Sequence, residues 1–110
     1  MNKVLLTGYF AADPELKHTP GDKPKPFVRF SMAVRRPHVK DRRADFLSCM
    51  AWGKLAEIVC QYAKKGTLAE VEGYYTIESY KPEGEEKAKS KHQIVVEQFY
   101  MLAKSNQGEE

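Results

Sequence analysis

Apolar and polar residues alternate along five separate stretches of this chain, and each alternation predicts a β-strand. The predicted strands cover Asn2–Phe10, Phe27–Arg35, Asp45–Trp52, Thr67–Tyr80 and His92–Leu102. In the first, Val4, Leu6 and Phe10 share one side and point inward. In the fourth, the side that includes Val71, Tyr75 and Ile77 is expected to point inward.

The stretches between these strands predict one helix and two long connections. Leu55, Ile58, Val59 and Tyr62 recur at helical spacing in Lys54–Lys65, and Gly66 is expected to cap that helix. Ala11–Pro26 contains four prolines and is therefore read as connecting structure. Lys81–Lys91 is polar and charged and carries Pro82 and Gly84, which predicts a projecting hairpin loop.

The third predicted strand carries apolar side chains on both faces. One face has Leu47, Cys49 and Ala51, and the other has Phe46, Met50 and Trp52. A helical pattern follows at once, which argues against a strand covered on both faces in a parallel sheet. Phe46 and Trp52 therefore predict an exposed surface that stacks on flat ligands such as nucleobases. The alternative is that these rings pack under a loop or in a subunit interface.

The order of elements indicates an all-β fold. Five strands with one helix between the third and the fourth is the order of the OB-fold, a five-stranded Greek-key barrel that binds oligonucleotides across one face. Gly8 and Gly73 lie inside strands and favour the strong bends that a barrel requires. An ordinary α+β sheet is the alternative.

Length and charge add two constraints. The 110 residues suit a single domain over residues 1–104, followed by a short polar tail over 105–110. A net charge of +3 is too small to predict a polyanionic partner by itself. Five cations nevertheless gather just before the aromatic strand, where they form either a solvated loop or the phosphate-binding side of a groove. They are Arg35, Arg36, Lys40, Arg42 and Arg43.

Nothing in the sequence predicts catalysis, a metal site or a cofactor. Cys49 and Cys60 form no CxxC or Cys/His cluster and are read as buried thiols. Asp13 and Glu15 flank a proline without a nearby histidine, so a catalytic pair is not expected there. No apolar run has the length of a membrane span, and the first residues lack a signal-peptide pattern, which predicts a reduced, cytoplasmic location.

With these residues in view, the chain resembles the bacterial and phage single-stranded DNA-binding proteins. The matching stretches follow one another in order through nearly the whole chain. They are Asn2–Gly8, Asp13–Lys17, Phe30–Val34, Trp52–Glu57, Tyr62, Lys65–Gly66 and Val71–Gly73.

The resemblance implies a function and a set of site residues. Family members wrap single-stranded DNA on aromatic rings that correspond here to Phe46, Trp52 and Tyr80, with a fourth position at His38. Tyr74 shares the outward phase of Tyr80, and Ser48 shares that of Phe46. The five loop cations complete the predicted site. Family members assemble through the outer side of the first strand, which predicts a homotetramer or dimer in contact at Lys3, Leu5, Thr7 and Tyr9.

Two departures from the family pattern limit what is expected. Thr76 and Glu78 stand where relatives often place basic residues, so phosphate contacts beside Tyr80 should be weaker. Cellular relatives end in a long tail with an acidic tip that recruits replication and repair enzymes, and Ser105–Glu110 offers no such spacer. The expected function is sequence-independent DNA binding in replication, recombination and repair, without tail-mediated recruitment. The alternative is an OB-fold protein-interaction module, such as a primosomal accessory protein.

Overall fold

All five predicted strands are present in the computed structural model, which describes residues 1–38, 40 and 43–104. A further two-residue strand precedes the second predicted one. The elements are β1 (Val4–Phe10), β2 (Lys17–His18), β3 (Pro26–Arg35), β4 (Ala44–Trp52), α1 (Gly53–Tyr62), β5 (Leu68–Tyr80) and β6 (Lys89–Ala103). Residues 105–110, where the polar tail was expected, lie outside the described part of the chain.

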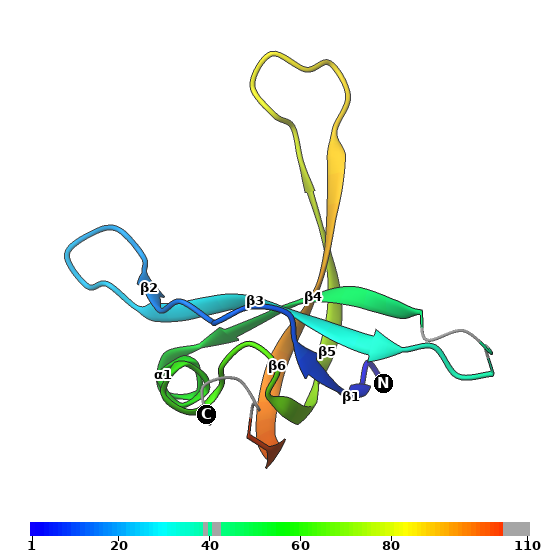
Figure 1. Ribbon diagram of the computed structural model, residues 1–110. Helices are drawn as coiled ribbons and strands as arrows, with labels where there is room; N and C mark the ends of the chain where they lie inside the picture. The colour runs from blue at the N-terminus through cyan, green and yellow to red at the C-terminus, as the bar shows by residue number, and fades with distance from the viewer. Residues whose placement is uncertain (39, 41–42, 105–110) are drawn as a thin grey trace.

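The strands close into a barrel. Their order in the sheet is β1-β5-β6-β4-β3-β2, and a second pairing of β1 with β3, through Tyr9 with Ala33 and Phe10 with Met32, closes the ring. β4 and β6 run parallel, whereas every other pair is antiparallel. With α1 between β4 and β5 (Figure 1), this is the OB-fold, so the predicted fold class is confirmed.

Alternating residues from the five barrel strands fill the core. Phe10 is 1% exposed, and its ring stacks on Phe30 with 4.7 Å between ring centroids. The face of β4 that includes Cys49 and Ala51 points into the same core. α1 covers one end of the barrel, where it packs against β3, β4 and β6 through Ala56, Val59 and the adjoining Ala63.

The helix is shorter than predicted. It ends at Tyr62 with Ala63 as its C-cap, so the prediction that Gly66 caps it is wrong. Gly66 instead turns the chain into β5 with a φ of 90°, and its N–H donates to the carbonyl of Phe10. Tyr62 is 53% exposed, and the buried residues of α1 are Ala56 and Val59. No helix in the described residues combines the length and apolar character needed to cross a membrane.

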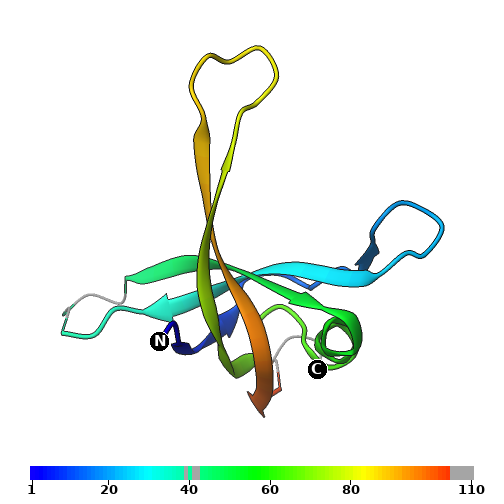
Figure 2. The same ribbon diagram turned by 180° about the vertical axis from the view of Figure 1, so that it is seen from behind.

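β5 and β6 extend beyond the core as a long hairpin, which stands away from the barrel in Figures 1 and 2. The prediction that Tyr75 and Ile77 point into the core is wrong, because at this height the hairpin has left the barrel and their exposed fractions are 41% and 56%. The loop between the strands is also shorter than expected, since β6 begins at Lys89. The connection before β3 projects as a further arm, and the described residues directly after β3 project on the other side of the barrel (Figure 1).

Gly73 marks the point where the hairpin departs from the barrel. The pairing of β5 with β6 shifts register between Glu72 and Gly73, which fits the bend predicted there. A Cβ at Gly73 would overlap the carbonyl oxygen of Val95 on β6. Only glycine permits this close approach of the two backbones.

Candidate nucleic-acid interface

The β2–β3 connection and the β5–β6 hairpin enclose a hollow of about 440 Å³ on the outer face of the barrel. We call this hollow the main groove. Strand register places its lining side by side, since Phe27 pairs with Trp52, Arg29 with Met50, and Tyr74 with Val95. Its wall also includes Thr76, Glu78 and Gln93 of the hairpin.

Trp52 is the central ring of the main groove. It is the last residue of β4, and Gly53, with a φ of 65°, turns the chain into α1 directly after it. The Trp52 and Phe27 rings lie 5.3 Å apart between centroids at a tilt of 39°, and the Arg29 guanidinium stands 5.4 Å from the Phe27 centroid. Trp52 nevertheless stays 44% exposed, so its indole remains available to a ligand.

Met50 lies between Trp52 and Ser48 on the same face of β4 but is only 4% exposed. The parallel pairing of β4 with β6 places Val95 beside it, so both side chains form the floor of the groove. The second apolar face of β4 thus combines a buried floor at Met50 with exposed rings at its two ends. Phe46, the other ring, is 68% exposed.

The remaining predicted rings continue along the hairpin. Tyr74 lines the main groove and is 38% exposed. Tyr80 shares its phase on β5 and lines a neighbouring hollow together with Lys91 and His92. A smaller hollow lined by Arg29, Ser48, Lys91 and Gln93, here called the second hollow, extends this polar and aromatic surface toward the middle of β4.

None of the predicted loop cations that the structure describes lines the main groove. Arg36 is held by Asp45, with its Nε at 2.9 and 3.0 Å from the two carboxylate oxygens and its Nη2 at 2.9 Å from Oδ1. The hydrogen bonds from Arg36 lower the pKa of Asp45, and the same bonds raise the pKa of Arg36. This bidentate pair ties together the two strand ends that carry the loop.

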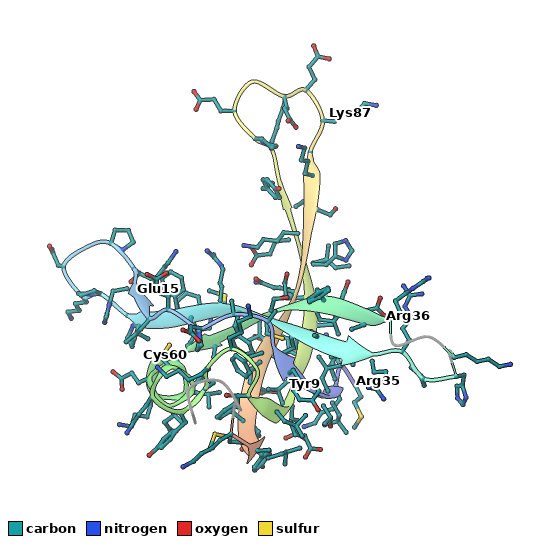
Figure 3. The ribbon with its side chains drawn as sticks, viewed as in Figure 1. Tyr9, Glu15, Arg35, Arg36, Cys60 and Lys87 are labelled. Atoms are coloured by element: carbon teal, nitrogen blue, oxygen red, sulfur yellow. The ribbon has the colours of Figure 1, made fainter. Side chains whose placement is uncertain are left out.

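Arg35 lies elsewhere, in a hollow that it shares with Thr7 and Tyr9 of β1. Figure 3 shows Arg36 on the loop arm and Arg35 nearer Tyr9. His38 and Lys40 are exposed on the loop, and His38 adopts a φ of 64°, as is tolerated at a turn. Arg43 is exposed but engaged with a neighbour, and Arg42 lies outside the described residues.

The outer side of β1, predicted to be a subunit contact, is exposed and partly apolar. Leu5 is 65% and Tyr9 52% exposed, while Lys3 forms an ion pair of 3.0 Å with Glu72 of β5. Tyr100 of β6 lies two strands away on the same side, since it pairs with Glu70, which in turn pairs with Thr7. From the sequence, Tyr100 was read as either a core or an interface residue, and the structure leaves it 52% exposed.

Sequence reasoning did not single out Phe27, Arg29 and Gln93 of the main groove, or Lys91 of the two neighbouring hollows, as site residues. Phe27 and Arg29 alternate on the outward face of β3, and this phase was the available signal, but Phe27 was read only as the start of a strand. Lys91 was assigned to the predicted hairpin loop. Gln93 was placed in the fifth predicted strand, and no role was given to it. Both enter the surface only because β6 pairs with both β4 and β5.

The reactivity and metal-binding capacity of the two cysteines and the described acidic residues follow from their pKa shifts and positions. Burial raises the pKa of the Cys49 thiol to about 12 and also raises that of Cys60. Across residues 1–38, 40 and 43–104, no three His, Cys, Asp or Glu side chains gather closely enough to hold a metal ion. The carboxylate of Asp13 instead accepts a hydrogen bond of 2.7 Å from the Lys65 N–H, which secures the connection after β1.

Comparison with known proteins identifies relatives of the whole domain. A single-stranded DNA-binding protein of Clostridium perfringens is 38% identical over 108 residues, which cover 98% of this chain and 70% of that protein. Those of Halalkalibacterium halodurans and Bacillus cereus are 42% and 40% identical over 83 residues, or 73% of this chain, and the matched segment spans 48% of each protein. A model of the single-strand binding protein family matches residues 1–102, and the chain belongs to this family.

Proposed function

We propose that this chain binds single-stranded DNA by stacking bases on the exposed rings of its outer face, without requiring a particular sequence. The observation that carries the proposal is that Trp52 and Tyr74 line one groove together with Arg29. Phe46 and Tyr80 extend this surface in two directions. The relatives named above, which are single-stranded DNA-binding proteins, support the same assignment.

Stacking supplies the sequence-tolerant part of the affinity. Base–aromatic stacking contributes about 1–3 kcal/mol per base, and every base has a face that can stack. A duplex presents its bases already stacked and paired, so it cannot use isolated rings of this kind. Preference for single strands follows directly.

Phosphate contacts come chiefly from the groove cations. Arg29 stands beside the Phe27 ring, and Lys91 lines the two hollows next to the main groove. Arg36 contributes less, because Asp45 already satisfies its guanidinium. Lys40, Arg43 and the imidazole of His38 add contacts from the exposed loop, while Arg35 lies closer to the β1 side. The predicted contact of Arg42 falls outside the described residues.

The chain assembles through the outer face of β1, as a dimer or a homotetramer. Leu5, Tyr9 and Tyr100 leave an apolar surface there that a second copy would cover, with Lys3 and Thr7 at its margin. This surface and the main groove involve different residues. Assembly therefore leaves the stacking rings accessible and lets one strand pass over several subunits, which suits protection of single-stranded DNA in replication, recombination and repair.

A protein-interaction module is the second candidate function, because the same rings could dock a peptide. A peptide surface has no need of the groove cations, so dependence on salt separates the two. Each phosphate contact to a single strand contributes about 0.7 to the slope of log affinity against log salt. Arg29→Gln should flatten that slope by about this amount, whereas the matched Arg36→Gln should change it less.

The decisive experiment uses the fluorescence of Trp52, the single tryptophan of the chain. Titration with oligo(dT) should quench it, and excess oligo(dT) of another length should compete. Duplex DNA of equal length should compete poorly. Equal competition by duplex, or absence of quenching, would refute the proposed function and favour the protein-interaction module.

A further inference from the structure

A side chain continues the pairing of β1 with β5 beyond the start of β1. The backbone pairing of these strands ends where Val4 faces Gly73. Before this point in the chain, the side-chain amide of Asn2 forms two hydrogen bonds with the backbone of Tyr75. Its Nδ2 donates to the Tyr75 carbonyl at 2.7 Å, and its Oδ1 accepts from the Tyr75 N–H at 2.9 Å. The amide of Asn2 therefore takes the place of a peptide group in the sheet.

These two bonds lie close to the bend at which the hairpin leaves the barrel. The register of β5 against β6 shifts directly after Glu72, and Tyr75 follows in the same strand. At the level of Tyr75, Ile94 of β6 pairs with both Tyr75 and Cys49 of β4. The hairpin is thus held by β4 along its β6 edge and by Asn2 along its β5 edge. Beyond this level, the described backbone of the hairpin pairs only with itself.

Tyr75 also contacts the part of the hairpin that carries a predicted stacking ring. Its hydroxyl hydrogen-bonds Nδ1 of His92, and the two rings meet edge to face with 5.8 Å between centroids. His92 lines the same hollow as Tyr80. Tyr74, the residue before Tyr75, lines the main groove. A movement of the hairpin at this level would therefore displace Tyr74 and Tyr80 relative to Trp52, which lies on β4.

We propose that Asn2 is a positioning residue for DNA binding, which fixes the direction of the hairpin and thereby the places of Tyr74 and Tyr80. This inference rests on the proposed function. Without the amide, the hairpin is held along its β6 edge alone and can turn about the bend at Gly73. DNA then either loses the hairpin rings or has to restore the direction of the hairpin, and both lower the affinity.

Asn2→Ala should weaken the binding of oligo(dT) about three- to ten-fold, close to what one net hydrogen bond contributes. Because Asn2 is exposed, the variant should unfold only a few degrees below the native chain. Gln61→Ala is the matched control, since it removes an exposed amide from α1, outside the main groove, and should keep native affinity. Quenching of Trp52 measures the affinities, because each of these variants retains that residue.

Two double-mutant cycles distinguish positioning from a direct contact of Asn2 with DNA. Tyr80→Ala should cost about three-fold less affinity in the Asn2→Ala background than in the native chain, because a displaced hairpin gains less from its ring. Phe46→Ala removes a ring from β4 rather than from the hairpin. Its cost should be the same in both backgrounds within about two-fold.

Hydrogen exchange followed by NMR tests the contact itself without DNA. The Tyr75 N–H donates to Asn2 in the native chain, so it should exchange about ten-fold faster or more in Asn2→Ala. The N–H of Val71, in the part of β5 that pairs with β1, should exchange as in the native chain.

The outcomes separate this inference from the proposed function. Native affinity in Asn2→Ala, unchanged exchange at Tyr75, or costs of Asn2→Ala and Tyr80→Ala that simply add would overturn positioning through the hairpin. Faster exchange at Val71 as well would overturn it too, because the substitution would then loosen the whole barrel. Absence of quenching by oligo(dT) in the native chain would refute DNA binding itself, whereas the exchange result at Tyr75 does not depend on DNA.

Discussion

Replacement of Trp52 with alanine tests the groove most directly. The variant removes an indole that is 44% exposed and lies against Phe27 at 5.3 Å. Loss of one stacking platform should weaken DNA binding by about 1–3 kcal/mol, which corresponds to a factor of about 5 to 150 in the dissociation constant. Loss of the ring pair should cost about 0.5–1.5 kcal/mol of folding stability, in addition to the loss of the part of the indole surface that is buried.

Replacement of a buried core ring, Phe30, provides the comparison for the stability loss expected in Trp52→Ala. Phe30 is 8% exposed and its ring stacks on Phe10 in the core, so Phe30→Ala should cost about 3–5 kcal/mol. Trp52→Ala should therefore remain folded at 25 °C and unfold only a few degrees below the native chain. We therefore expect Trp52→Ala to change mainly the affinity for DNA and Phe30→Ala to change mainly the folding stability.

The assay must not depend on the tryptophan that is removed. Anisotropy of a fluorescein-labelled oligo(dT) reports binding by both proteins, and thermal unfolding by circular dichroism reports stability. Tyr62→Ala is the matched control, because Tyr62 is 53% exposed on α1 and lies outside the groove. Native affinity in Trp52→Ala would refute stacking at this position, and an unfolded variant would show that Trp52 is a structural residue.

Three further predictions concern other parts of the molecule. Gly73→Ala should strongly destabilise the fold in chemical denaturation, because its Cβ would overlap backbone of β6; an unchanged midpoint would contradict the close approach. At pH 8 a thiol reagent should modify Cys60 well before Cys49, whose pKa is about 12, and both should react at similar rates once the chain is unfolded. Asp45→Asn should release Arg36 and steepen the salt dependence of DNA binding by up to about 0.7. Because Arg36 lowers the pKa of Asp45, their pair should persist above about pH 4 and disappear only as the pH falls through the lowered pKa, which a carboxyl titration by NMR would follow.

Local patterning was sufficient to predict the barrel. Strict alternation in β1 and β3 assigns Phe10, Phe30 and their neighbours to the core, because side chains along a strand alternate between its faces. The same parity placed Phe46 and Trp52 outside, where the structure has them exposed. The glycine inside β5 likewise indicated a bend before any contact was known.

Pairing between strands far apart in the sequence determined several residue positions that alternation along a strand could not predict. Tyr75 and Ile77 have the alternation of core residues, yet they lie on the part of the hairpin that extends beyond the barrel and are exposed. Alternation along a strand does not indicate where the strand extends beyond the core. Arg36 looked like one cation in a basic run, but the pairing of β3 with β4 brings Asp45 to its guanidinium.

The order of strands and helix, the inward and outward faces of the strands within the barrel and the family resemblance were therefore determined by the sequence alone, whereas the faces of the projecting hairpin were not. The main groove was decided only by the tertiary structure. Phe27, Trp52, Tyr74 and Gln93 come from four strands, and closure of the ring through β1 with β3 and β4 with β6 sets their juxtaposition. Such contacts span most of the chain, and no local pattern encodes the distance between their side chains.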